Sequence, residues 1–340
     1  MNMDELVSLE QHMLEPSPAL IEDVSRIKGD ILLLGVAGKM GPAMARVARR
    51  AVDAAGTGQR VIGVSRFSNP ASRAELEDAG VETIPANLLD DQELASLPDA
   101  PNVIYLAGHK FGTTGNESYT WAMNTYLPGR VAERYKHSNI VAFSSGNVLP
   151  FVPVTSGGAS EDITPEPIGE YAQSCLGRER IFEYFSEKNG TPMLIYRLNY
   201  AVDFRYGVVL EIAKSVLQGK PIDLRTENVN VIWQGDANEI AIRSLLHCQS
   251  PAKMLNVTGP ETLSTRWIAN QFGLIFGKEP QFAYEPQGTA LLNNASECHR
   301  LFGYPRVTIR EIIELTARWL REGGEQLDKP THFQERAGKF

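Results

Sequence analysis

Short runs of apolar residues alternate with longer amphipathic stretches along the first 200 or so positions of the chain. The first run, DILLLGVAG at residues 30–38, is typical of a strand that is covered by helices on both faces. Further strand-like runs lie at residues 59–65, 81–85, 102–107, 139–144 and 192–198, and helical patterns lie between them at residues 40–54, 72–79, 117–135 and 169–187. This alternation predicts an α/β fold, a doubly wound parallel sheet with right-handed crossovers.

The pattern becomes less regular after residue 203, where single strands and helices are separated by turn signals. We therefore expect a smaller C-terminal domain that is interleaved with the sheet rather than cleanly separated from it. The predicted division is a helical extension at residues 1–28, a sheet domain at 29–203 and 229–261, a smaller domain at 204–228 and 262–322, and a polar surface tail at 323–340.

Composition narrows the function classes. A net charge of −8 with scattered basic residues argues against a nucleic-acid partner. The widely spaced Cys175, Cys248 and Cys298 predict reduced thiols in a cytoplasmic protein rather than a disulfide frame. We expect no signal peptide and no membrane partner, because no apolar run is long enough for either. No His, Cys, Asp or Glu cluster has the spacing of metal ligands.

A glycine-rich turn follows the first strand directly and opens the next helix. Its spacing, G-x-x-G-x-x-G, differs from both the G-x-G-x-x-G dinucleotide motif and the Walker loop. Glycines allow the turn, let the backbone approach a pyrophosphate and let helix and strand pack closely. At the first strand of a repeating α/β pattern, they favour dinucleotide binding over a purely structural turn. The expected cofactor contacts are Gly35, Gly38, Lys39, Met40 and Gly41.

The end of the second strand carries Ser65 and Arg66 where a carboxylate would hold the adenosine ribose. Without that carboxylate nothing repels a 2′-phosphate, and an arginine is well shaped to bind one. The residues therefore favour NADP over NAD as the cofactor, although Arg66 could simply be solvated. Asn87 and Leu88, after the third strand, are expected to lie beside the adenine.

Several short segments, in this order, resemble the extended short-chain dehydrogenase/reductase family, specifically its NAD-dependent epimerase/dehydratase branch. They are GVAGKMG, LAGHK at residues 106–110, Asn124, FSSGNV at 143–148, Tyr171 and RLNYAV at 197–202. The resemblance covers residues 30 to 303 and implies a Rossmann-type sheet domain that binds the dinucleotide and a smaller domain that binds the substrate. The cofactor contacts that it implies, beyond the turn, are Leu106, Ala107, Gly108, Lys110, Asn124, Tyr171 and Cys175.

The resemblance also implies the catalytic residues. Ser145 falls on the family's serine, and Tyr171 on its acid/base tyrosine. A tyrosine has an ordinary pKa of about 10, so it needs a nearby positive charge to act as a base at neutral pH. The family's lysine lies four residues after the tyrosine, and here that position is Cys175.

The missing charge has three candidate replacements. Arg178, seven residues after Tyr171, returns to nearly the same helix face, and Lys110 follows the fourth strand. His109 ranks behind these two. Arg178 could instead be solvated on the helix surface, Lys110 could contact only a cofactor phosphate, and His109 could be a polar residue of the core. Cys175 itself is more often a buried apolar residue than a nucleophile.

The substrate residues are less distinctive. Gly146 and Asn147 stand where dehydratases of the family carry an acidic pair, so hydride transfer or epimerisation is expected rather than dehydration. Candidate substrate contacts are Ser145, Asn147, Asn199, Tyr200, Arg205 and Trp233, although Arg205 could be solvated and Trp233 could fill the core. Asp236 could cap a helix. Such groups suit a sugar, a sugar acid or a nucleotide sugar.

The sequence thus predicts an NAD(P)-dependent sugar oxidoreductase or epimerase. The alternative is a dinucleotide-binding sensor or scaffold of the same fold that has lost turnover together with the lysine. Retention of Ser145 and Tyr171 favours the enzyme, because a sensor has no chemical need for either. The resemblance also implies a homodimer formed through the helices that follow the fourth and fifth strands.

Overall fold

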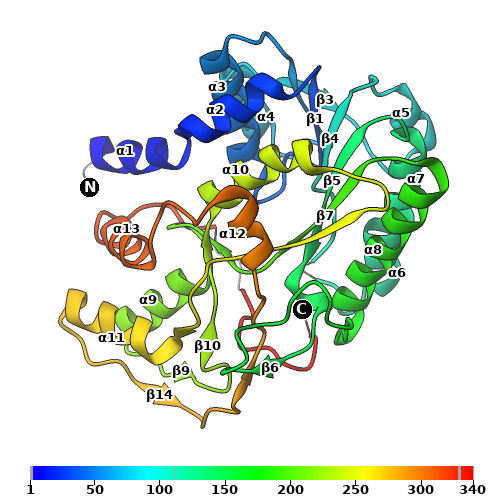
Figure 1. The fold of residues 1–340 in the computed structure, drawn as a ribbon. Coiled ribbons are helices and arrows are strands. Elements are labelled where there is room, and N and C mark those ends of the chain that lie inside the picture. The colour runs from blue at the N-terminus through cyan, green and yellow to red at the C-terminus, as the bar shows by residue number, and fades with distance from the viewer. Residues whose placement is uncertain (1–2, 111, 328–330, 340) are drawn as a thin grey trace.

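The computed structural model describes residues 3–110, 112–327 and 331–339, so the predictions for residues 1–2, 111, 328–330 and 340 lie outside the described residues. Seven parallel strands form the central sheet, in the order β12-β7-β5-β4-β1-β2-β3 (Figure 1). These strands are β1 (Ile31–Leu34), β2 (Val61–Ser65), β3 (Glu82–Pro85), β4 (Asn102–Tyr105), β5 (Asn139–Ser145), β7 (Met193–Leu198) and β12 (Lys253–Val257). The predicted Rossmann-type doubly wound sheet is confirmed.

Strand β1 explains why the sheet is covered on both faces. Its side chains alternate, so that Ile31 and Leu33 join one core cluster while Leu32 and Leu34 join the other, and all four are fully buried. Helices α2 (Pro18–Arg26), α3 (Gly41–Ala55) and α10 (Gln234–Arg243) pack together over the first cluster. Helices α7 (Leu127–Arg134) and α8 (Gly169–Asn189) cover the second (Figure 1).

The remaining elements are shorter or lie at the edges. The helices are α1 (Met3–Met13), α4 (Pro70–Asp78), α5 (Asp91–Ser96), α6 (Glu117–Trp121), the π-helical turn η1 (Ala122–Tyr126), the 3₁₀ turns η2 (Gly146–Val148) and η3 (Ser244–His247), α9 (Val208–Gln218), α11 (Thr265–Phe276), α12 (Ser296–Phe302) and α13 (Ile309–Arg321). The two-residue strands are β6 (Val152–Pro153), β8 (Ala201–Val202), β9 (Ile222–Asp223), β10 (Asn228–Val229), β11 (Ile232–Trp233), β13 (Leu263–Ser264), β14 (Phe282–Ala283) and β15 (Thr289–Ala290). None of the described helices is both long enough and apolar enough to cross a bilayer.

The single helix predicted over residues 117–135 is interrupted in the structure. Pro128 has no N–H group, so it cannot form the helical hydrogen bond to the carbonyl oxygen of Asn124. The chain widens into the π turn η1 at this point, and Arg178 from α8 donates its Nε–H to that oxygen at 3.3 Å. A tertiary contact therefore replaces the missing helical bond.

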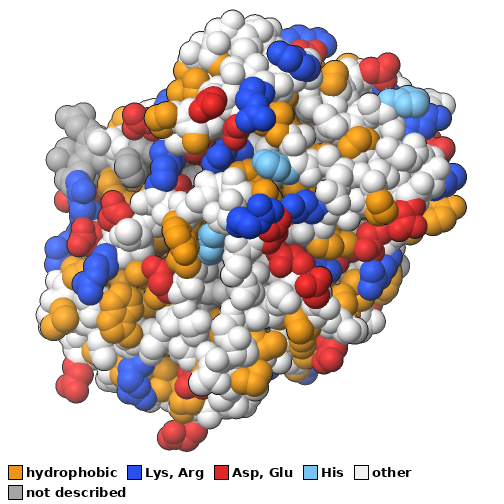
Figure 2. All heavy atoms as spheres, viewed as in Figure 1, with side chains coloured by type: hydrophobic (Ala, Val, Ile, Leu, Met, Phe, Trp, Pro, Cys, Tyr) orange, Lys and Arg blue, Asp and Glu red, His pale blue; other side chains and the backbone are white. Residues whose placement is uncertain are grey.

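The chain after residue 203 leaves the sheet and returns to it. Helices α9, α11 and α13 pack against one another below α1 in Figure 1, whereas β12 re-enters the sheet beside β7. The division into a dinucleotide-binding and a substrate domain stays a prediction. On the face drawn in Figure 2, Lys and Arg side chains are interspersed with Asp and Glu, and no basic stripe crosses it.

The segment expected to be a polar surface tail is only partly exposed. Thr331 and Phe333 keep 6% and 7% of their surface exposed, and Phe333 belongs to the main core cluster. The tail expectation was therefore wrong for Thr331 and Phe333, whereas Ala337 and Lys339 in the same segment are exposed. A single aromatic ring and a few polar contacts anchor the segment to the rest of the protein. The sequence does not reveal this, because no periodic apolar pattern marks the segment.

Candidate active site and cofactor cleft

The glycine turn has the geometry that a dinucleotide needs. Gly35 has a φ of +89°, and a Cβ there would lie 2.7 Å from the backbone nitrogen of Ala107. A Cβ on Gly41 would lie 2.1 Å from the carbonyl oxygen of Val36, so the first turn of α3 packs directly on the loop. Gly38 has only a 3.4 Å contact within its own turn and faces open space. Two glycines therefore shape the turn, and the third leaves room for a ligand.

A first cavity of about 360 Å³ lies at the carboxyl ends of β1, β2, β3 and β4. The predicted cofactor residues that line it are Gly35, Gly38, Ser65, Arg66, Asn87, Leu88, Leu106, Ala107 and Gly108. Among the residues that the structure describes, no carboxylate lines this cavity, and Arg66 is exposed and makes no ion pair or hydrogen bond with them. Such a cavity can hold the adenosine half of a dinucleotide.

A second cavity of about 370 Å³ continues from the first past Gly35 and Gly38 toward β5 and α8. The predicted residues that line it are Gly35, Gly38, Lys39, Met40, Gly41, Leu106, Gly108, Lys110, Ser145, Asn147, Tyr171, Asn199 and Tyr200. The glycine turn and the proposed serine–tyrosine pair thus share one cavity, as the transfer of a hydride from a bound dinucleotide requires.

Ser145 and Tyr171 meet at the base of this second cavity. Burial raises the pKa of Tyr171 above its ordinary value, while a hydrogen bond with Ser145 and the charge of Arg178 act to lower it. The Ser145 hydroxyl also donates to Oδ1 of Asn147 at 3.2 Å and accepts the backbone N–H of Asn147. The tyrosine therefore keeps its proton at neutral pH, and Ser145 lies within hydrogen-bonding distance of its hydroxyl.

Cys175 lies beneath this pair, fully buried, and does not line either cavity. Burial raises the pKa of its thiol, so the thiolate that a nucleophile requires is disfavoured. Asn124 also lies outside both cavities. Its side-chain amide nitrogen donates to the carbonyl oxygen of His109 at 2.8 Å and to the hydroxyl of Ser174 at 3.0 Å.

Arg178 is buried behind the cavity rather than facing it. Its guanidinium donates to Oδ1 of Asn124 at 2.7 Å and to the carbonyl oxygen of Phe143 at 2.8 Å. It therefore joins the turn η1 to the end of β5, and a Cβ on Gly108 would lie 2.7 Å from it. The arginine contributes charge to the site but cannot reach a ligand without breaking these bonds.

Two lysines do face the second cavity. The Nζ of Lys110 lies 5.6 Å from the centre of the Tyr171 ring. The Nζ of Lys39 donates to the carbonyl oxygen of Ala201 at 2.8 Å and lies 3.8 Å from the centre of the Tyr206 ring. Burial lowers the pKa of both amines, that of Lys39 to about 7. The two amines therefore lie where a pyrophosphate and a reacting oxygen would lie, and in the absence of an anion each loses its proton more readily than a solvated lysine.

The other candidates are held elsewhere. His109 contacts Thr120, with Nδ1 and Oγ1 3.0 Å apart, and does not line either cavity. Arg205 lies in an ion-pair cluster with Asp203 and Glu10, also outside both cavities.

Trp233 is 2% exposed and packs on Phe204 in the core. Asp236 does not cap its own helix, because it accepts the backbone N–H of Val307 at 3.0 Å and a hydrogen bond from Arg306. Trp233 and Asp236 therefore stabilise the fold through these contacts.

Sequence reasoning missed part of the lining. Tyr206 and Val208 follow the RLNYAV segment and line the second cavity, while Asn69 and Ser72 flank Arg66 in the first. The residue without any sequence signal is Thr331, which reaches the second cavity from the far end of the chain. Among the described residues, no group of three or more His, Cys, Asp or Glu side chains is arranged to hold a metal ion.

Comparison with solved structures supports the fold. A UDP-glucuronic acid 4-epimerase from Bacillus cereus, solved with NAD, superposes with a TM-score of 0.71 at 19% identity, covering 86% of this chain and 99% of that one. An epimerase from Methanothermobacter thermautotrophicus gives 0.72 at 18% identity, covering 91% and 97%. At these identities the likeness concerns the fold. A search of curated protein sequences found no match.

The sequence itself matches a family model over residues 31–247. The matched region contains the glycine turn, the strand ends that line the two cavities, and the Ser145–Tyr171 pair. It spans more than half of the chain. The expectation of an enzyme family is thereby confirmed. The chain belongs to the NAD dependent epimerase/dehydratase family.

Proposed function

We propose that the protein transfers a hydride between a nicotinamide dinucleotide and a hydroxyl-bearing carbon of a sugar, a sugar acid or a nucleotide sugar. The observation that carries this proposal is the hydrogen-bonded Ser145–Tyr171 pair in the same cavity as the glycine turn. Oxidation followed by re-reduction on the other face would give epimerisation. Hydride transfer without re-reduction would give a simple dehydrogenase.

The residues divide the chemistry between them. The dinucleotide, when bound, supplies or accepts the hydride. Tyr171 donates its proton to a carbonyl oxygen in the reducing direction, and in the oxidising direction its phenolate, favoured by a nearby positive charge, takes the proton of an alcohol. Ser145 hydrogen-bonds the same oxygen. Lys110 is the better candidate for the charge that Cys175 cannot supply, because it faces the cavity and the Tyr171 ring, whereas the guanidinium of Arg178 is committed to Asn124 and Phe143.

The first cavity supports a preference for NADP over NAD. Arg66 is exposed at the end of β2, and no carboxylate lines the cavity to repel a 2′-phosphate. Ser68 and Asn69 beside it can donate further hydrogen bonds to such a group. The similar structures that were solved with NAD have low sequence identity to this chain, so their cofactor does not decide between NAD and NADP here. The preference rests on the residues of the first cavity.

The experiment is the appearance of reduced nicotinamide, followed by its near-ultraviolet absorbance with NADP or NAD and a panel of sugars, sugar acids and nucleotide sugars. An epimerase is followed in parallel by separation of the epimers. Tyr171→Phe is expected to lower turnover by about 100-fold or more, because general acid–base catalysis contributes about that much, and to leave cofactor affinity unchanged. Cofactor binding without turnover of any compound would favour the non-catalytic sensor instead.

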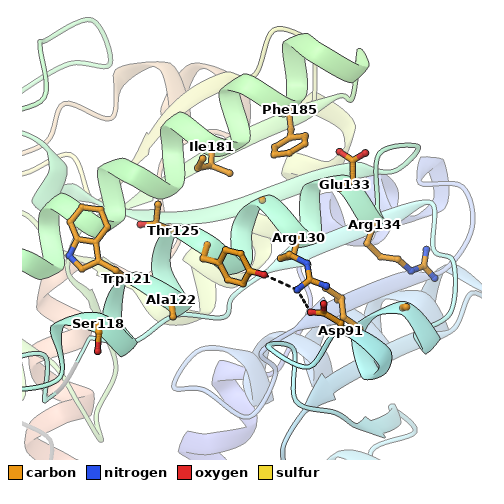
Figure 3. Close-up of a pocket in the computed structure, with 14 residues that line it drawn as sticks. Asp91, Ser118, Trp121, Ala122, Thr125, Arg130, Glu133, Arg134, Ile181 and Phe185 are labelled. Carbon is orange, nitrogen blue, oxygen red and sulfur yellow. Dashed lines mark hydrogen bonds and ion pairs between the residues drawn. The ribbon is translucent and has the colours of Figure 1, made fainter.

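We also infer a homodimer in the cytoplasm. A groove of about 910 Å³ runs between α6–η1–α7 and α8 (Figure 3). Trp121, Tyr126, Ile181 and Phe185 give it an apolar lining, and Tyr126 is 58% exposed. Both signs of charge flank it, because Asp91 and Glu133 lie beside Arg130 and Arg134. A surface that is apolar and carries both signs suits a second copy of itself about a two-fold axis.

A further inference from the structure

Residues 331–339 return to the cleft from the far end of the chain. Thr331 lines the second cavity together with Ser145 and Tyr171. His332, Glu335, Arg336 and Gly338 line a narrow adjoining cavity of about 30 Å³, which they share with Lys110 and Asn147. This adjoining space has room for little more than a water molecule. The segment therefore fills the side of the cleft that lies beyond the serine–tyrosine pair.

The segment is anchored on several elements. The backbone N–H and the hydroxyl of Thr331 both donate to the carboxylate of Glu211 on α9. Arg336 donates to the carbonyl oxygen of Thr289 at 2.8 Å, and its guanidinium lies 4.1 Å from the centre of the Phe151 ring. These contacts fix the segment to α9, to β15 and to the loop that follows Ser145.

The end of the segment contacts the helix that carries Tyr171. Gly338 has a φ of 73°, and a Cβ there would lie 2.3 Å from the carbonyl oxygen of Ile168. The backbone of the segment thus packs directly against the start of α8, three residues before the tyrosine. A side chain in place of this glycine would push the two apart.

The remaining space limits the substrate. The second cavity, about 370 Å³, must take the nicotinamide end of the dinucleotide as well as the reacting molecule. Pockets for drug-sized ligands span about 300 to 1,000 Å³, so this one is near the lower limit before any substrate enters. Residues 331–339 bound the cleft on the side beyond the serine–tyrosine pair, so a nucleoside diphosphate that extends from the substrate on that side would collide with them.

We infer that residues 331–339 form the outer wall of the substrate pocket and restrict it to a free monosaccharide or sugar acid that carries no nucleotide. This inference rests on the proposed function of the Ser145–Tyr171 site and narrows its substrate class. The polar groups that line the second cavity on this side, including Lys110, Asn147 and Thr331, suit hydroxyl and carboxylate groups.

The test compares matched pairs of compounds on the full chain saturated with NADP or NAD. Dissociation constants are measured by calorimetry for glucose against UDP-glucose, for galactose against UDP-galactose, and for glucuronate against UDP-glucuronic acid. At least one free compound is expected to bind about 10-fold or more tightly than its UDP-linked counterpart. The inference is overturned if no free compound binds more tightly than its counterpart.

Variants locate the effect on the segment. Arg336→Ala removes the anchor on Thr289 and Phe151, so it is expected to reduce the preference for the free compound over its UDP-linked counterpart by about 10-fold, which corresponds to about 1.4 kcal/mol. Lys339→Ala, an exposed change in the same segment, is expected to bind as the unchanged protein does. Equal binding by both variants would overturn the role of the segment.

Hydrogen exchange of the unchanged protein gives a readout that does not depend on a variant's folding. The free compound is expected to slow exchange of the backbone amides of residues 331–339. Faster exchange on addition of UDP-glucose would mean that the segment is a displaceable lid, and it would overturn the inference. Binding of the free compound without hydride transfer would support the size limit and count against the proposed function, so the two failures are distinguishable.

Discussion

At the scale of single residues, the cleft is defined by where its charges lie. Lys39 and Lys110 face the second cavity, whereas Arg178 is held behind it. Cys175, which replaces the family's lysine, is fully buried and cannot hold a ligand. The amines that face the cavity near Tyr171 therefore lie on the loop after β4 and on the glycine turn, while Arg178 on α8 acts on Tyr171 from behind the cavity.

We expect Lys39 to make cofactor binding depend on pH. Burial lowers its pKa from 10.5 to about 7 in the free protein, and the negative charge of a bound pyrophosphate would raise the pKa again. A group with a higher pKa in the complex takes up a proton on binding, so affinity should fall as pH rises above about 7. Calorimetry at about pH 8.5 in buffers of different ionisation enthalpy should show this uptake.

The control for this prediction is Lys39→Met, which keeps the apolar stem and removes the amine. Uptake should disappear and the affinity should become less dependent on pH. An unchanged uptake in Lys39→Met would assign the proton to another group, with Lys110 the next candidate.

Arg66 should decide between the two cofactors. Arg66→Ala is expected to weaken NADP binding by about 10-fold or more, since a charged hydrogen bond contributes about 1.5–3 kcal/mol. NAD has no 2′-phosphate, so its affinity serves as the internal control and should stay within about twofold. Dissociation constants from fluorescence titration check both. Equal losses for the two cofactors would mean that Arg66 does not bind the 2′-phosphate.

At the scale of elements, the site depends on the junction between η1, β5 and α8. Arg178 satisfies the carbonyl oxygen of Asn124, which Pro128 leaves without its helical partner, and also the carbonyl oxygen of Phe143. In the sequence, a proline lies inside a helical pattern. In the structure, this region forms a π turn, and an arginine from the next helix supplies the hydrogen bond that the proline cannot donate.

Arg178→Met should therefore destabilise the protein by about 2–4 kcal/mol, because buried acceptors lose their donors. The matched control is Arg180→Met on the same helix, whose side chain is 58% exposed and pairs with Glu183, with an expected change within about 0.5 kcal/mol. Denaturant unfolding measures both. A loss for Arg178→Met no larger than that of the control would contradict the structural role.

At the scale of the whole molecule, two further regions have proposed roles: the groove of Figure 3 and the segment of residues 331–339. The groove of Figure 3 lies on the side of α7 and α8 that faces away from the sheet, and residues 331–339 lie on the substrate side of the cleft. The first is the proposed contact with a second copy, and the second is the proposed wall of the substrate pocket.

Tyr126→Asp should convert the dimer to a monomer at micromolar concentration. The change removes an aromatic ring from the apolar lining and adds a carboxylate beside Arg130, and desolvating that carboxylate on association would be costly. Tyr304→Asp is the matched control, because Tyr304 is 73% exposed and lies outside the groove. Sedimentation velocity distinguishes the species. A dimer in Tyr126→Asp, or a monomer in the unchanged protein, would contradict the proposed interface.

The strands, the helices and the glycine turn could be predicted because their signals are local. Apolar runs, helical periodicity and the G-x-x-G-x-x-G spacing each depend on neighbouring residues, and the order of these elements implied the sheet. The strand ends that line the first cavity, including Arg66 and Asn87, followed from the same argument, because the carboxyl ends of parallel strands share one edge.

Tertiary structure alone decided what lies between distant segments. No local pattern says that Arg178 donates a hydrogen bond to the carbonyl oxygen of Asn124, that Trp233 lies in the core, or that Thr331 reaches the cavity of Tyr171. Each of these outcomes depends on packing between residues far apart in the sequence, where burial and a few hydrogen bonds choose the partner. The sequence by itself determined the fold and the cofactor turn, and the packing determined the charges around Tyr171 and the size of its pocket.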